Sequence, residues 1–345
     1  MRVLVFGGWG QLGSDLAAVA HGRHEVVRPR HGAVDVVQMN DVAAIVEEVR
    51  PAAVVNAAAF HKLELCESDP ERSYSTNEGG ARNVARAAAA LGARSVYIST
   101  DYVFDGEKGE PYTEDDSVSP LSVYGESKAA GERAVLESAP EAAVVRTSGL
   151  FGHAGSSGKG GNFVETMLAK GIRREAISVV DDQISSPTAT RDLADRLLLL
   201  LEEDVPGGVY HVTNAGRCSW YELAREALRL AGVGADLTPV RTDPNAEVRR
   251  PSFSAMIDTK QMALGLPPLR RWQDALAWYL AERGPGRRGA SASRPAAAEA
   301  SPNSVEDDAI VGVDPEQRRG RHVGHDGRRG ADHERRESAS HQGVD

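Results

Sequence analysis

The chain has 345 residues, 41% of them hydrophobic and 26% charged, which leaves room for one large folded domain or two modest ones. Its formal net charge of −10 argues against a nucleic-acid-binding surface, because the lysines and arginines before residue 280 are scattered rather than gathered in a stripe. The two cysteines are not spaced as metal ligands, and no apolar run approaches the roughly 18 residues that cross a membrane. We therefore expect a cytoplasmic protein that holds no metal and binds neither nucleic acid nor a membrane.

Short β-branched segments alternate with alanine-rich helical segments through the first half of the chain. The alternation is typical of βαβ units, and the segments at 3–6 and 54–55 are apolar on both faces, as strands covered by helices on both sides should be. This pattern predicts an α/β fold with a doubly wound parallel sheet of the Rossmann type. Strands are expected at residues 3–6, 24–27, 53–56, 95–99 and 144–145, with helices from about Gln11, Asp41 and Thr76.

The second half of the chain has a looser pattern. A glycine-rich loop at 155–161 precedes an expected strand at 177–180 and a leucine-rich helix from about Asp192. We expect residues 1–282 to form one unit. Its first 150 residues or so should make most of the cofactor-binding part, and the remainder a smaller α+β substrate-binding subdomain with segments that return to the first sheet.

Residues 283–345 differ in composition from the rest of the chain. They are rich in arginine, glycine, alanine, serine and acidic residues and almost lack aromatic side chains. Such a segment cannot bury enough apolar surface to offset the entropy of ordering it. We predict a disordered tail.

A glycine-rich turn, Gly7-Gly-Trp-Gly-Gln-Leu-Gly13, directly follows the first expected strand and opens a helix. Gly7, Gly10 and Gly13 fit the spacing G-x-x-G-x-x-G, in which glycine permits a tight turn and a close approach of the backbone to a pyrophosphate. The alternative is a flexible surface turn, which the strand, the helix and the position together disfavour. We expect Gly7, Gly10, Gln11, Leu12 and Gly13 to bind a nicotinamide dinucleotide.

Two arginines stand where the second expected strand ends. NAD-preferring sites usually place Asp or Glu there to bond the ribose hydroxyls, whereas Arg28 and Arg30 offer guanidinium groups that can fork onto a 2′-phosphate. The alternative is that both are ordinary surface side chains. The sequence therefore favours NADPH over NADH, with Asp35 and Val36 placed where the chain passes the adenine.

Tyr124-Gly-Glu-Ser-Lys128 places a tyrosine and a lysine four residues apart, on one face of a helix. An ammonium near the phenol is expected to lower the phenol pKa from about 10, and the same lysine can hold the nicotinamide ribose. Thr100 follows the expected strand at 95–99, and ligands of open α/β sheets bind beyond the carboxyl ends of the strands. Thr100, Tyr124 and Lys128 are thus the predicted catalytic residues, with Tyr124 as general acid and Thr100 bonding a ketone oxygen.

The chain resembles the extended short-chain dehydrogenase/reductase superfamily through the glycine turn, Asn56-Ala-Ala-Ala59, Ser99-Thr-Asp101 and the pair Tyr124 and Lys128. A closer resemblance, over roughly residues 1–280, is to dTDP-4-dehydrorhamnose reductases. It implies that NADPH or NADH reduces the 4-keto group of dTDP-4-dehydro-6-deoxy-L-mannose, giving dTDP-L-rhamnose. The stretches that carry it include Gly10-Gln-Leu-Gly13, Ser99-Thr-Asp-Tyr-Val-Phe-Asp-Gly106, Val180-Asp-Asp-Gln183, Ser219-Trp-Tyr-Glu222 and Arg249-Arg-Pro251.

The resemblance also implies positions near the substrate and the cofactor. Arg249 and Arg250, which precede a proline, offer two cations able to hold a diphosphate. The expected partners are a small sugar nucleotide and, as one option, a second copy of the chain. By resemblance, Tyr102, Asn162 and Arg249 lie near the sugar nucleotide, and Ala57, Ala58 and Ala59 lie near the cofactor.

Three other functions compete with a reductase. A dehydratase of the superfamily is expected to have an acidic pair after the threonine, whereas here Asp101 is followed by Tyr102. A 4-epimerase retains NAD tightly, while the arginines after the second strand favour an exchangeable phosphate-bearing cofactor. A non-catalytic regulatory subunit is expected to have lost a catalytic residue, and all three are present. Asp181 and Asp182 fit a polar loop better than the carboxylate pair of a glycoside hydrolase.

Overall fold

The structure is a computed structural model that describes residues 1–30, 32–154 and 161–283. The expected tail after Arg283 and most of the expected glycine-rich loop at 155–161 lie outside the described residues. Every element and contact below belongs to the described part of the chain.

Six parallel strands form the main sheet, in the order β10-β5-β4-β3-β1-β2. The order confirms the doubly wound α/β fold. In register, Phe6 lies beside Asn56 and Thr100 lies beside Thr147, so the segments that follow these strands leave the sheet at one edge. The strands are β1 (Arg2–Phe6), β2 (Glu25–Val27), β3 (Ala53–Asn56), β4 (Arg94–Thr100), β5 (Ala143–Thr147) and β10 (Gly208–His211).

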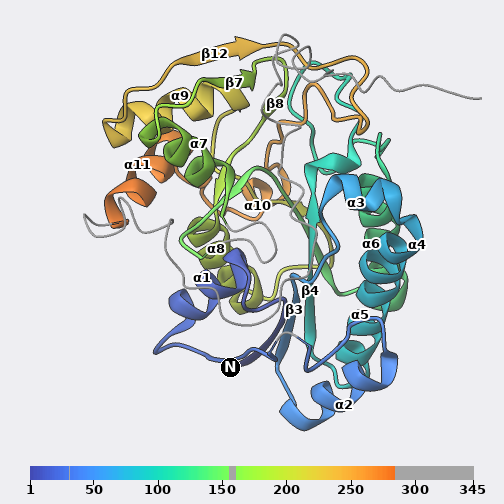
Figure 1. The fold of residues 1–345 in the computed structure, drawn as a ribbon. Helices are drawn as coiled ribbons and strands as arrows, with labels where there is room; N and C mark the ends of the chain where they lie inside the picture. Colours follow the sequence, from blue (N-terminus) through green and yellow to red (C-terminus); the bar gives the residue numbers. More distant parts are fainter. Residues whose placement is uncertain (31, 155–160, 284–345) are drawn as a thin grey trace, which may run out of the picture. The chain divides into compact units, whose positions relative to one another are not determined.

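Helices cover both faces of this sheet (Figure 1). Alternate residues of β1 explain why: Val3 and Val5 pack among residues of the helices on one face, and Leu4 and Phe6 pack among those on the other. The strand is apolar on both sides because neither side faces water. The helices are α1 (Gln11–Ala20) and α8 (Thr190–Glu202) on the first face, and α2 (Met39–Val49), α5 (Ala81–Ala90) and α6 (Val123–Ser138) on the second.

The helix expected from about Thr76 begins earlier and is interrupted. Asp69 accepts a hydrogen bond from the backbone N–H of Arg72 at 3.0 Å and Pro70 occupies the first helical turn, so a helix starts there. It continues through a π-helical turn that turns Asn77 into the interior, where its side chain is fully buried. The segments are α3 (Leu63–Ser68), α4 (Pro70–Tyr74), the π-helical η1 (Ser75–Gly80) and then α5.

A second cluster of helices and short strands follows β5. Its core gathers Met167, Leu168, Leu223, Leu228 and Leu276, while β10 and α8 return to the main sheet. Its longer elements are α7 (Phe163–Ile172), β7 (Ile177–Val180), α9 (Trp220–Ala231), β12 (Leu237–Val240) and α11 (Trp272–Glu282). The short ones, with the turn after β4, are η2 (Asp101–Val103), β6 (Leu150–Phe151), β8 (Ile184–Ser185), β9 (Thr188–Ala189), β11 (Cys218–Ser219) and α10 (Lys260–Ala263).

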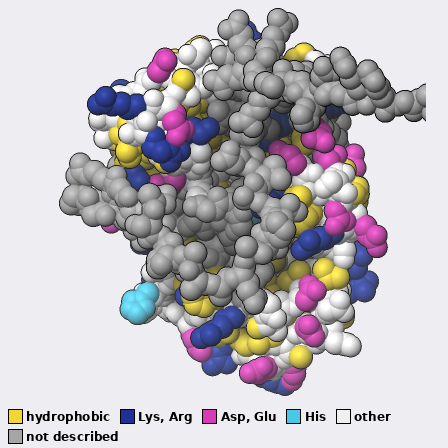
Figure 2. Space-filling model, in the orientation of Figure 1, with side chains coloured by type: hydrophobic (Ala, Val, Ile, Leu, Met, Phe, Trp, Pro, Cys, Tyr) yellow, Lys and Arg dark blue, Asp and Glu magenta, His cyan; other side chains and the backbone are white. Residues whose placement is uncertain are grey.

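The surface in view carries both signs of charge. Figure 2 shows lysine and arginine side chains interspersed with aspartate and glutamate over the described residues of one face. Within the described ranges, no helix is both long enough and apolar enough to span a membrane.

Candidate active site

The three predicted catalytic residues meet where β4 ends. Thr100 is the last residue of β4, and Tyr124 lies in the first turn of α6, which Ser122 caps by accepting a hydrogen bond from the Gly125 N–H at 3.3 Å. The Thr100 side chain lies near enough to the Tyr124 hydroxyl to act on the pKa of the phenol. One turn along α6, Lys128 donates from Nζ to the Ile98 carbonyl of β4 at 2.6 Å. The structure therefore brings the trio to one strand end.

The pKa values in this trio differ from the expected direction. Burial raises the pKa of the Tyr124 phenol above its ordinary value, and the nearby Thr100 side chain only partly opposes this rise. Burial also lowers the pKa of the Lys128 ammonium to about 7, although Glu132 favours its charged form. Lys128 is not among the main influences on the phenol pKa, and its Nζ instead donates to a carbonyl and lies 4.0 Å from the centre of the Tyr97 ring. The phenol consequently keeps its proton across the neutral range.

Asp101 is a buried carboxylate that the sequence did not mark as part of the site. It accepts hydrogen bonds from Thr100 at 3.2 Å, from Ser148 at 2.7 Å and from Ser254 at 2.5 Å. Burial raises its pKa, and the three hydroxyl donors oppose that rise. Because these donors come from three separate segments, Asp101 ties the catalytic strand end to the second half of the chain.

A buried ion pair joins the catalytic helix α6 to the neighbouring strand β5. Arg146 of β5 donates to Glu132 of α6 from Nε at 2.9 Å and from Nη2 at 2.7 Å, and Ser99 donates to the same carboxylate at 2.5 Å. Both charged side chains are 5% exposed. Removing one partner of such a pair would leave a buried charge uncompensated. The pair therefore fixes α6, and with it Lys128, against the sheet.

The glycine turn is shaped by close backbone approaches. Gly7 has φ +73°, and a Cβ there would lie 2.7 Å from the Ala57 carbonyl, while a Cβ on Gly13 would lie 2.4 Å from the Gly8 Cα. These contacts hold the start of α1 against the end of β3. Only glycine fits both places.

The N-terminus of α1 suits an anionic ligand. Its N-cap, Gly10, supplies no side-chain hydrogen bond and the first turn contains no acidic residue. By contrast, α9 begins with a capping box in which Ser219 and Glu222 satisfy the first backbone N–H groups. The free N–H groups and helix dipole at Gln11 and its neighbours fit a dinucleotide pyrophosphate.

The four residues predicted to bind the adenosine end of the cofactor differ in their surroundings. Arg28 packs over the glycine turn, and its Nη1 donates to the Gly8 carbonyl at 3.3 Å. Arg30 is exposed. Asp35 accepts from the Val37 N–H at 3.0 Å and shapes a turn, and Val36 is buried against Gly80.

Asn77, which sequence reasoning missed, organises the segment after β3. Its side chain accepts from the Phe60 N–H and donates to the Phe60 carbonyl, both at 2.9 Å, and donates to Ser127 Oγ at 3.0 Å. Ser127 precedes Lys128, so one buried amide links the predicted cofactor segment, Ala57 to Ala59, with the catalytic helix. The asparagine is distant in sequence from both, and no local pattern indicates this role.

Of the two arginines before Pro251, the buried one contacts the site. Arg249, predicted near the substrate, is exposed, whereas the Arg250 side chain is 3% exposed. Arg250 Nη1 lies 3.4 Å from the Tyr102 hydroxyl and Nη2 lies 3.4 Å from Glu64, while its buried Nε has no hydrogen-bond partner in the described structure. The Tyr102 ring in turn meets the Tyr124 ring edge to face, with centroids 5.8 Å apart. Arg250 is therefore a better candidate than Arg249 for a residue near the substrate.

Asn162 has a supporting position rather than an open one. It caps α7 by accepting from the Glu165 N–H at 3.0 Å, and it donates to the Gly152 carbonyl at 2.9 Å and to Gln11 at 3.3 Å. Its side chain is buried and shared among these partners. Through Gln11 it connects α7 with the glycine turn.

A narrow cleft opens beside Tyr102. The neighbouring carboxylates of Asp181 and Asp182 are held in structural hydrogen bonds. Asp181 accepts from the Ser219 hydroxyl at 2.5 Å, and Asp182 accepts from the Thr242 N–H at 3.0 Å. The residues that line the cleft are Asp101, Tyr102, Gln183, Ile184, Ser185, Trp220, Pro251 and Ser254.

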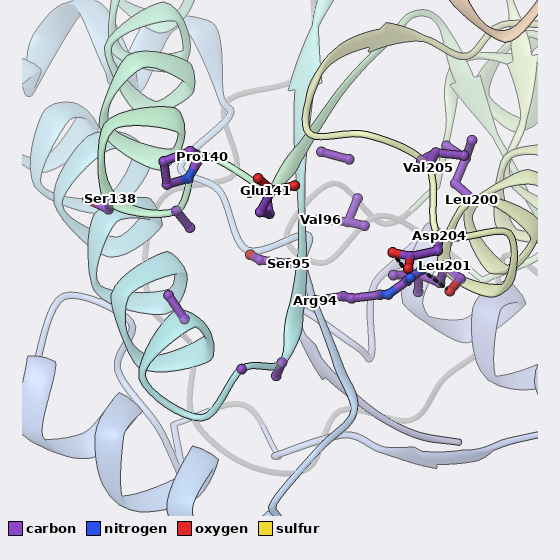
Figure 3. Close-up of a pocket in the computed structure, with 16 residues that line it drawn as sticks. Arg94, Ser95, Val96, Ser138, Pro140, Glu141, Leu200, Leu201, Asp204 and Val205 are labelled. Carbon is purple, nitrogen blue, oxygen red and sulfur yellow. Dashed lines mark hydrogen bonds and ion pairs between the residues drawn. The ribbon is translucent and has the colours of Figure 1, made fainter. Parts of the chain in front are cut away.

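A wider hollow lies at the amino ends of β4 and β5, away from the predicted catalytic residues (Figure 3). Its walls are mostly apolar and come from the C-terminal ends of α5, α6 and α8. Two of its charged side chains are engaged with each other, because Arg94 donates to the Leu201 carbonyl and pairs with Asp204. Other labelled lining residues include Ser95, Val96, Ser138, Pro140, Glu141, Leu200 and Val205.

Comparison with known proteins places most of the chain in one family. The model of the RmlD substrate binding domain matches residues 1–284. A dTDP-4-dehydrorhamnose reductase of Streptomyces griseus is 41% identical over 285 residues, covering 80% of this chain and 91% of the relative. A dTDP-4-keto-6-deoxy-D-glucose reductase of Streptomyces niveus is 38% identical, covering 80% of this chain and 95% of the relative.

The fold also matches a solved structure of the same kind. The crystal structure of dTDP-4-dehydrorhamnose reductase from Bacillus anthracis in complex with NADP superposes with a TM-score of 0.78. It is 36% identical in sequence and covers 81% of this chain and 99% of its own.

Proposed function

The chain belongs to the RmlD substrate binding domain family, and from this we propose that it is an NADPH-dependent reductase of a nucleotide-activated 4-keto-6-deoxyhexose. The preferred substrate is dTDP-4-dehydro-6-deoxy-L-mannose, and the product is dTDP-L-rhamnose. The observation that carries the proposal is the meeting of Thr100, Tyr124 and Lys128 at the end of β4, beyond the carboxyl edge of a sheet that also carries an uncapped glycine turn.

The residues around the glycine turn fit a nicotinamide dinucleotide. Gly10, Gln11 and Leu12 would hold the pyrophosphate on the N-terminus of α1, and the segment after β3 would lie along the cofactor. Lys128 would hold the nicotinamide ribose. When bound, the reduced cofactor supplies a hydride to the carbonyl carbon of the sugar.

The catalytic trio handles the proton and the developing charge. Tyr124 retains its phenol proton because burial raises its pKa, and it gives that proton to the ketone oxygen as the oxygen becomes a hydroxyl. Thr100 would donate to the same oxygen when the sugar is bound, its single hydroxyl proton turning away from Asp101, which accepts it at 3.2 Å in the structure. The ketone is thereby reduced to an alcohol, with one hydride and one proton added.

The second candidate substrate is the D-gluco isomer of the ketosugar. It is favoured by the similarity to the Streptomyces niveus reductase, whose name specifies that sugar. The narrow cleft lined by Gln183 and Trp220 adjoins Tyr102, and sugar selection would act there. A 4-epimerase remains the third candidate, because the two activities share the tyrosine and lysine.

We also propose a cytoplasmic protein. The use of NADPH and two buried cysteines without a disulfide both fit a reducing compartment. A homodimer is proposed as an option to be tested by sedimentation of the purified protein.

The test is turnover of NADPH with a panel of nucleotide 4-ketosugars, followed at 340 nm as the cofactor is oxidised, with the product identified by NMR. We expect stoichiometric oxidation with the dTDP-linked L-mannose derivative and a product of L-rhamno configuration. The Thr100→Val variant should retain partial turnover, about 10–100-fold reduced, because Tyr124 still protonates the oxygen. Isomerised sugar without net cofactor oxidation would indicate an epimerase, and binding of NADPH without turnover of any sugar would indicate a regulatory subunit.

A further inference from the structure

The glycine turn carries an exposed aromatic side chain that the pyrophosphate fit does not use. Trp9 lies between Gly8 and Gly10 and is 53% exposed. The guanidinium carbon of Arg28 lies 4.2 Å from the centre of its ring, which is the distance of a stacked cation–π contact. The contact joins the turn after β1 to the residue that follows β2.

Arg28 can take this position because Gly8 has no side chain. A Cβ on Gly8 would lie 2.7 Å from the Arg28 Cγ and 2.9 Å from its Cβ. Arg28 Nη1 also donates to the Gly8 carbonyl at 3.3 Å. The guanidinium is therefore held on its face by Trp9 and at one nitrogen by the backbone, which reduces the rotamer freedom that a ligand would otherwise have to remove.

The remaining donors of Arg28 are available to a ligand. In the described ranges no carboxylate pairs with Arg28, whereas Arg2 pairs with Glu25 and Arg23 pairs with Glu202. A planar guanidinium with free N–H groups matches the oxygens of a phosphate. Arg28 directly follows β2, where sheets of this type recognise the 2′ position of the adenosine ribose.

We propose that Trp9 is a positioning residue for the 2′-phosphate of the cofactor, acting through the Arg28 guanidinium that it stacks against. Arg28 donates to the phosphate oxygens, and Trp9 holds the guanidinium flat in the orientation that allows this. Arg30, which is exposed and whose side chain makes no hydrogen bond or ion pair with another described residue, takes no part. The inference rests on the proposed use of NADPH, but its test needs neither sugar substrate nor turnover.

The test is calorimetric binding of two ligands that differ only in the 2′-phosphate, adenosine 2′,5′-bisphosphate and adenosine 5′-monophosphate. The unaltered protein should bind the bisphosphate at least about tenfold more tightly, because a charge-assisted bidentate contact is among the strong ones. The Arg28→Met variant should bring the ratio of the two dissociation constants close to one. The Trp9→Ala variant should reduce the ratio by roughly threefold or more, while Trp9→Phe, which keeps an aromatic face, should stay near the unaltered value.

Arg30→Met is the matched control, since it removes a neighbouring arginine of equal charge and should leave the ratio unchanged. Helical circular dichroism and unfolding temperature should be the same in all variants, because the altered side chains lie at the surface of the turn. A ratio that collapses in Arg30→Met but not in Arg28→Met, or that is unchanged in Trp9→Ala, would overturn the proposal. Failure of the proposed reaction would instead appear as intact bisphosphate binding without turnover.

Discussion

The two edges of the main sheet differ in what they bury. At the carboxyl edge, Thr100, Asp101 and Lys128 are buried and hydrogen-bonded, the half-buried Tyr124 lies beside them, and the adjoining cleft is narrow. At the amino edge the hollow is wider, but its walls are apolar and its one labelled ion pair joins Arg94 to Asp204, whose side chain is 85% exposed.

Helix direction explains the difference. The helices α5, α6 and α8 end at the amino edge of the sheet, so free carbonyls and the negative ends of helix dipoles gather there. The N-terminus of α1 lies at the other edge. An anionic dinucleotide and an anionic sugar nucleotide are therefore expected to bind at the carboxyl edge. The hollow at the amino edge is larger, but it is a poorer candidate for the active site than the narrow cleft.

The largest effect should follow from Tyr124→Phe at the carboxyl edge. The ring is kept and the proton is lost, so turnover should fall by about 10²–10⁴-fold while cofactor and substrate binding stay close to normal. Steady-state kinetics with the dTDP-linked ketosugar, together with direct binding, measure both. Near-normal turnover would remove Tyr124 as the acid. In the unaltered enzyme, any loss of activity caused by ionisation of this phenol should come above the ordinary phenol pKa of 10.0, because burial raises it.

A smaller effect should separate the two adjacent arginines. Arg250→Met should lower kcat/KM by roughly 10–100-fold, because it removes a buried cation that contacts the Tyr102 hydroxyl and Glu64. Arg249→Met, the matched control, should change kcat/KM by less than about threefold, since its side chain is exposed. Equal losses in both variants would return Arg249 to the substrate site.

Lys128 should make stability depend on pH. Its pKa is about 7 in the folded protein, against an ordinary value of 10.5, so between these values the unfolded chain binds the additional proton. The free energy of unfolding should therefore rise with pH, by about 2 kcal/mol from pH 7 to pH 9. Lys128→Met should flatten the rise. Urea unfolding of both proteins at the two pH values measures this, and parallel pH dependence would show that another group is responsible.

The smallest effect is expected at the amino edge. Arg94→Met removes a partly exposed ion pair and one bond to the Leu201 carbonyl, so the free energy of unfolding should fall by about 1 kcal/mol. Turnover should stay within about twofold, because the hollow is remote from the carboxyl edge. Asp204→Asn provides the control for the ion pair alone. A tenfold loss of turnover would mean that the hollow communicates with the reaction.

Local patterns in the sequence were sufficient for five of the six strands of the main sheet, but they did not predict β10. The strand expected at 53–56 coincides with β3 and that at 177–180 with β7, because short β-branched segments buried on both faces are distinctive. The start of the helix predicted at Thr76 was wrong, because Asp69 and Pro70 act as a helix start within a polar segment that lacks a clear apolar period.

The sequence by itself determined which residues could act: the glycine spacing, the tyrosine and lysine one turn apart, and a threonine after a buried strand are all local features of the chain. Tertiary structure alone decided which of two adjacent arginines is buried, which serines reach Asp101, and in which direction the pKa values of Tyr124 and Lys128 move. Burial and contacts between distant segments set those properties, and neither is encoded in the spacing of neighbouring residues.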